Sequence, residues 1–185
     1  MNLNLTWDLF IVVFFAIVVT YTFIIGKNES VKIIVSSYIG IVAVQGFTNV
    51  LARIASYTGP LLGGFGLPVT PTVISMGKLA LFIAIIIFLA LRSGFEATYP
   101  KEPNAVVNAL ITALFGFATA GLLLSTLLTY VAGVPLLDMS LANAAALSPV
   151  IQQSQFMQIM ILHQDLWFSL PAVVLIAVGF LHHKE

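Results

Sequence analysis

Apolar residues along the chain gather into five long stretches, and the short segments between them hold most of the charges. A helix that crosses the roughly 30 Å hydrocarbon layer of a bilayer needs about 17–25 mainly apolar residues, and each stretch is close to or above that length. The pattern therefore predicts an all-α fold, a polytopic helical membrane protein with about five transmembrane helices. The expected spans cover about residues 9–26, 31–55, 71–91, 105–130 and 166–181.

The segment before the last stretch carries a weaker helix signal. Three glutamines recur there at three-residue intervals among apolar residues: Gln152, Gln155 and Gln158. This amphipathic pattern predicts a short additional helix within residues 148–164, either lying in the membrane interface or re-entering the bilayer.

Composition supports the membrane class. Hydrophobic residues make up 60% of the 185 residues and charged residues only 8%, whereas soluble domains carry about 25% charged residues. The spans use most of the chain, so we expect a single transmembrane domain over residues 1–185, with lipid as its main surroundings. The formal net charge is zero, which argues against a nucleic-acid partner.

The distribution of basic residues predicts an orientation, because Lys and Arg collect in cytoplasmic loops. With five crossings, only Arg53 falls on the opposite side from the other loop and terminal cations. We therefore expect the N-terminus outside and the C-terminus in the cytoplasm, in a bacterial inner (plasma) membrane. The cations expected on the inner side are Lys27, Lys32, Arg92, Lys101 and Lys184.

Small residues form two candidate helix-packing faces, since close backbone approach drives helix association in lipid. These faces serve either packing within one chain or a seam between copies in a homo-oligomer. One lies on the fourth span and comprises Ala109, Ala113, Gly116 and Ala120; the other lies on the second span and comprises Ser36, Gly40 and Ala43.

Polar residues form two further stripes. Gln45, Asn49 and Arg53 are spaced four residues apart and share one line on the second span. A second stripe follows the fourth span through Asn108, Thr112, Thr119 and Thr126. These side chains either bond within and between helices or form the wall of a polar path through the membrane.

Lys78 is the most unusual single residue, because it lies about 10 Å inside the third span at 1.5 Å per residue. A cation at that depth normally faces the protein interior or water and has a partner. Three interpretations stay open: a stem that reaches outward to headgroups, a structural ion pair, or a role in transport. Asp8 and Asp165 are candidate partners, together with Asp138.

The sequence offers no catalytic motif, and no enzyme activity, cofactor or metal site is expected. There is no cysteine, which excludes thiolate catalysis and cysteine-ligated metals. His163 and Asp165 are too few to make a zinc site, which needs three or four ligands, and they are better explained as a helix cap at the interface.

Trp7-Asp8 opens the first span, the turn at residues 26–29 is short, and Asn108–Gly121 is rich in small residues. In these features the chain resembles the CvpA (colicin V production protein) family of small polytopic inner-membrane proteins. The resemblance covers about residues 7–130, lacks the family's Arg/Gly signature before the fourth span, and leaves a fifth span appended. It implies a role in an envelope or secretion-related assembly and no established catalytic residue.

Two functions follow as expectations. The first is a small integral membrane protein that is an oligomeric or partner-binding component of such an assembly. The alternative is a channel or transporter subunit with a polar path near Lys78.

Overall fold

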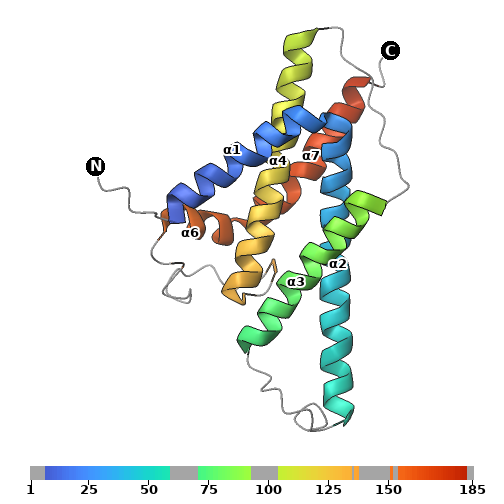
Figure 1. Cartoon of the computed structure of the whole chain (residues 1–185), viewed down its shortest axis with the longest axis vertical. Coiled ribbons are helices and arrows are strands. Elements are labelled where there is room, and N and C mark those ends of the chain that lie inside the picture. The colour runs from blue at the N-terminus through green and yellow to red at the C-terminus, as the bar shows by residue number, and fades with distance from the viewer. Residues whose placement is uncertain are drawn as a thin grey trace.

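The computed structural model describes residues 7–58, 71–92, 104–134, 136–137, 151 and 154–182. Within these ranges the chain is helical and contains no strand (Figure 1). The helices are α1 (Trp7–Ile25), α2 (Lys27–Thr58), α3 (Pro71–Arg92), α4 (Ala105–Ala132), α6 (Gln155–Leu162) and α7 (Gln164–His182).

Four of these helices, α1 to α4, are long and apolar enough to cross a membrane. Taken together as one unit, α6 and α7 are also long and apolar enough to cross a membrane, but the chain bends by 67° between the two helices. The prediction of an all-helical fold with several membrane-spanning helices and one short extra helix is therefore confirmed. The short helix begins after its N-cap Ser154; the glutamine Gln152 lies outside the described residues.

Successive long helices alternate in direction (Figure 1). In the view shown, α1 runs upward, α2 downward, α3 upward, α4 downward and α7 upward. In this view α1 begins at about mid-height on the left and α7 ends near the top. Which end faces the cytoplasm stays a prediction from the basic residues.

The turn between α1 and α2 consists of one residue, Gly26. Its φ angle is 83°, a left-handed conformation that glycine adopts without a steric cost. Its N–H donates to the Thr22 carbonyl at 2.8 Å and so closes the end of α1. The predicted tight connection is present, although α1 packs more extensively on α4 than on α2.

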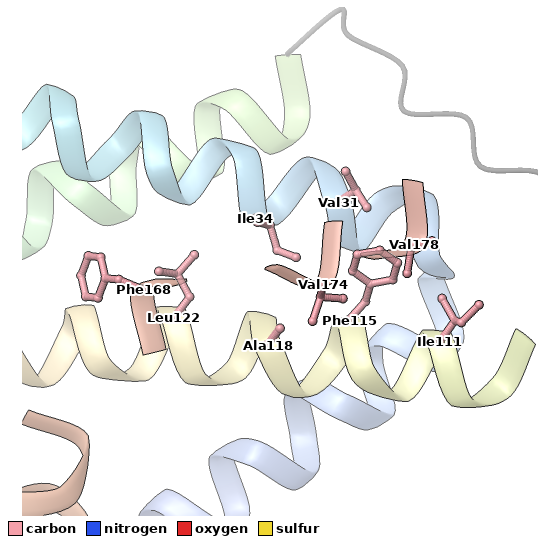
Figure 2. Packing of buried hydrophobic residues seen from close by; sticks show 9 residues of the cluster. All are labelled: Val31, Ile34, Ile111, Phe115, Ala118, Leu122, Phe168, Val174 and Val178. Carbon is pink, nitrogen blue, oxygen red and sulfur yellow. The ribbon is translucent and has the colours of Figure 1, made fainter. Parts of the chain in front are cut away.

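The core forms around α4, which contacts every other described helix to some extent and is the most buried of the spans. Figure 2 shows its main cluster, in which side chains from α2 and α7 meet one side of α4. The cluster comprises Val31, Ile34, Ile111, Phe115, Ala118, Leu122, Phe168, Val174 and Val178. By contrast, α1 and α3 bury few of their residues and expose large apolar side chains, which fits a membrane location.

Side-chain hydrogen bonds join the described helices at three places. Tyr38 on α2 donates its hydroxyl to the Phe168 carbonyl on α7. Ser125 on α4 donates to the Met160 carbonyl on α6 at 3.1 Å. Asp8 connects α1 with the start of α6. In a low-dielectric interior such bonds fix the relative positions of helices that apolar packing alone would let slide.

Candidate functional site

The carboxylate of Asp8 is committed to the N-terminus of α6. It accepts hydrogen bonds from Ser154 Oγ at 2.5 Å and from the Phe156 N–H at 3.2 Å. Ser154 is buried and also accepts from the Met157 N–H at 3.1 Å, so it is the N-cap of α6. An acidic group at a helix N-terminus satisfies unpaired N–H groups and the helix dipole, and we therefore assign Asp8 a role in holding α6 against α1.

Lys78 is half-buried on α3. It forms no hydrogen bond or ion pair with any residue that the structure describes, Asp8 being engaged at α6. Asp165 is exposed in the first turn of α7, and Asp138 lies outside the described residues. The candidate pairings of Lys78 with Asp8 and Asp165 are thus not formed in this arrangement, and the other interpretations of Lys78 stay open.

The stripe on α2 points away from the bundle. Gln45, Asn49 and Arg53 are all exposed, and Gln45 Nε2 donates to the side-chain oxygen Oδ1 of Asn49 at 3.5 Å. At 1.5 Å per residue, Gln45 and Asn49 lie about 27 and 33 Å from Lys27 at the start of the helix. They therefore lie near the far boundary of a hydrocarbon layer of about 30 Å.

The threonines on α4 are buried, and their hydroxyl groups form hydrogen bonds with the backbone of α4. The hydroxyls of Thr112, Thr119 and Thr126 each donate to the carbonyl four residues earlier, at 2.7–2.8 Å. Threonine commonly satisfies its hydroxyl in this way inside helices. The hydroxyl donors of this stripe are consequently used within α4 itself, whereas the Oδ1 of Asn108, the fourth member, is buried without a hydrogen-bond partner among the described residues.

The small residues of α4 divide between interior and surface. Gly116 and Ala120 are buried, Ala113 is half-buried and Ala109 is exposed. A Cβ atom at Gly116 would lie 3.1 Å from both the Thr22 Cβ and the Val19 Cα of α1. Gly116 thus lets α1 approach α4 closely within one chain.

The small residues of α2 divide in the same way. Ser36 and Gly40 are buried, and a Cβ at Gly40 would lie 3.2 Å from the Phe82 ring of α3. Ala43 is exposed, and so is the neighbouring Gly46, which has open space where a Cβ would be. The face therefore packs on α3 at Gly40, whereas Ala43 and Gly46 are left uncovered.

An apolar groove that sequence reasoning missed lies on the side of the bundle formed by α1 and α6. Its volume is about 510 Å³ and its lining is almost entirely apolar. Three rings form part of its wall, with centroids 5.2–5.8 Å apart: Phe15, Phe117 and Trp167. The remaining lining residues are Ile11, Val12, Ala16, Val19, Phe156, Ile159 and Met160.

No group of His, Cys, Asp or Glu suited to a metal ion occurs among the residues that the structure describes. Comparisons of the chain with protein-family models, with curated proteins and with solved structures found no significant match. The case for a function therefore depends on the surfaces of the protein itself.

Proposed function

We propose that this chain is a non-enzymatic integral membrane subunit that associates laterally, with copies of itself or with a membrane-protein partner, in an envelope or secretion-related assembly. The observation that carries the proposal is the outward direction of the polar stripe on α2. Residues that would wall a transport path if they faced inward are exposed on the surface instead.

The association surface is the outer α2 face, which we define as Val42, Ala43, Gln45, Gly46 and Asn49, all exposed. Ala43 and Gly46 form a shallow notch, because no atom lies within 4 Å of where a Gly46 Cβ would be. Small residues of this kind allow two helix backbones to approach closely, and amide side chains add hydrogen bonds between helices.

The amides are well placed for such bonds. The bond between Gln45 and Asn49 is long, at 3.5 Å, and it uses only part of the donors and acceptors of two amides. A neighbouring helix can supply the rest, so the amides would fix the register and the apolar and small residues would supply the contact area.

The alternative, a channel or transporter subunit with a polar path near Lys78, receives less support. The hydroxyls of the inward stripe donate within α4, and the amides lie outside the bundle. A relationship to the CvpA family, and with it the bacterial inner membrane, remains a prediction from the residues named above.

The proposal is tested by cross-linking in proteoliposomes. Because the chain has no cysteine, Ala43→Cys introduces a single thiol at the centre of the outer α2 face. A disulfide requires Cα atoms about 4.4–6.8 Å apart, so efficient dimer formation reports close contact at this position. Ala177→Cys, at an exposed alanine of α7, is the matched control and should cross-link poorly.

A glycine pair tests the notch without disturbing the fold. Gly46 and Gly179 both have open space where a Cβ would be, so leucine at either position fits within one chain. We expect Gly46→Leu to abolish the Ala43→Cys cross-link and Gly179→Leu to leave it intact. Equal cross-linking in both variants, or no cross-link at Ala43→Cys across a range of protein-to-lipid ratios, would overturn self-association through this face.

A further inference from the structure

We propose that the groove between α1 and α6 is a binding site for the acyl chain of a phospholipid, with the headgroup at the level of Asp8 and the start of α6. The inference concerns a different surface from the outer α2 face and does not depend on the proposed function. It follows from the lining of the groove, its surroundings and its position along α1.

The groove runs along α1 from Ile11 to Val19, which is about 12 Å at 1.5 Å per residue. Its lining is almost entirely apolar. The end near Ile11 lies one helical turn from Asp8, where the carboxylate, Ser154 and the exposed Gln155 gather. The site is therefore apolar along its length and polar at one end, which matches the chemistry of a lipid.

The surroundings of the groove favour a lipid as its occupant. The groove lies on α1, which exposes large apolar side chains such as Val12 and Ile17 and is long and apolar enough to cross a membrane. Lipid chains are therefore the molecules that surround this surface in a bilayer. A flexible hydrocarbon chain can follow the wall formed by Phe15, Phe117 and Trp167.

The position of α6 explains why an acyl chain would be bound in the groove and would not only lie next to the protein. α6 meets α7 at 67° and is fixed to α1 by Asp8 and to α4 by Ser125. Phe156, Ile159 and Met160 of α6 consequently form a wall opposite α1. An acyl chain between these walls touches protein on two sides, whereas one on the open surface of α1 touches it on one side only, and the additional van der Waals contacts favour the groove.

Tryptophan fluorescence tests the proposal directly. The protein has two tryptophans, and Trp167 alone lines the groove. The Trp7→Phe variant, in which Trp167 is the remaining tryptophan, is reconstituted into phosphatidylcholine vesicles. These vesicles contain increasing fractions of phosphatidylcholine that is brominated on its acyl chain. We expect quenching that rises steeply at low brominated fractions and then saturates, since one tightly held chain beside the ring dominates the signal.

Two adjacent valines provide the matched variants. Val12 lines the groove and Val13 lies outside it, and both are exposed on α1. Val12→Phe should fill part of the groove and weaken the apparent association about tenfold, because the added ring takes the place of part of the acyl chain, while Val13→Phe should have no effect. If Val12→Phe fails to assemble, Ile159→Phe fills the same groove from α6.

Two results would overturn the proposal. Quenching that is proportional to the brominated fraction and identical in both valine variants would show only the lipid that surrounds any membrane protein. Quenching that is weak at high protein-to-lipid ratios and recovers on dilution with lipid would show that a second copy of the chain covers the groove.

Discussion

Replacing Gly121 with alanine should destabilise the protein through a single contact. Gly121 is buried on α4, and an added Cβ would lie 2.3 Å from Cε3 and 2.7 Å from Cζ3 of Trp167 on α7. These separations are far below van der Waals contact, so the indole or the helix must move. The indole has little freedom, because the rings of Phe15 and Phe117 both lie 5.8 Å from it.

The size of the effect follows from a comparison with a second glycine. Overpacking a tight core by one methyl group costs about 1–3 kcal/mol. Alanine also favours a helix over glycine by about 1 kcal/mol, which partly offsets that cost. Gly46→Ala gains the same helix preference with no clash, since nothing lies within 4 Å of its Cβ position. The difference between the two variants therefore isolates the steric cost.

The measurement is thermal unfolding in detergent micelles, followed by circular dichroism. At about 2–4 °C per kcal/mol for a chain of this size, we expect Gly121→Ala to melt about 2–12 °C below Gly46→Ala. Truncating the ring with Trp167→Leu should remove most of this gap. If Gly121→Ala is as stable as Gly46→Ala, or if the gap persists without the indole, the packing of α7 on α4 described above is wrong.

Two further predictions rest on local geometry, and a third rests on the distribution of basic residues along the chain. Gly26→Ala should cost about 1–2 kcal/mol in unfolding free energy, because the left-handed φ of 83° is strained for alanine. Ser154→Ala should cost about 1 kcal/mol through loss of the N-cap of α6, seen as faster hydrogen exchange in α6 with α4 unchanged; uniform exchange rates would contradict it. A reporter fused after Glu185 should be active in the cytoplasm, and a periplasmic signal would reverse the orientation.

The positions of the helices were largely predictable from the sequence. Apolar runs that are long enough to cross a bilayer have few alternatives to a helix, because every backbone polar group must be satisfied internally. The observed α3, Pro71–Arg92, and α4, Ala105–Ala132, begin where the sequence places them. The largest change is α2, which extends from Lys27 to Thr58 instead of covering 31–55.

The direction in which a side chain faces could not be predicted in the same way. The four-residue spacing places Gln45 and Asn49 on one line of α2, and the structure keeps them on one line. In a soluble helix the polar line would mark the outside, but a membrane helix is apolar on all sides and carries little such contrast. Whether a polar line faces a path or the lipid depends on the neighbouring helices, which only the fold supplies.

The groove shows why the candidate site itself lay beyond sequence reasoning. It exists because α6 ends at Leu162 and α7 begins at Gln164, so that one residue, His163, turns the chain by 67°. Sequence reasoning allowed for a re-entrant segment there and placed Asp165 at the start of the last span, and it lies in the first turn of α7. The acid that fixes α6 is Asp8, more than 140 residues before Ser154, which it holds at the start of α6. No spacing rule connects residues so far apart, since the contact depends on α1 and α6 meeting across α4.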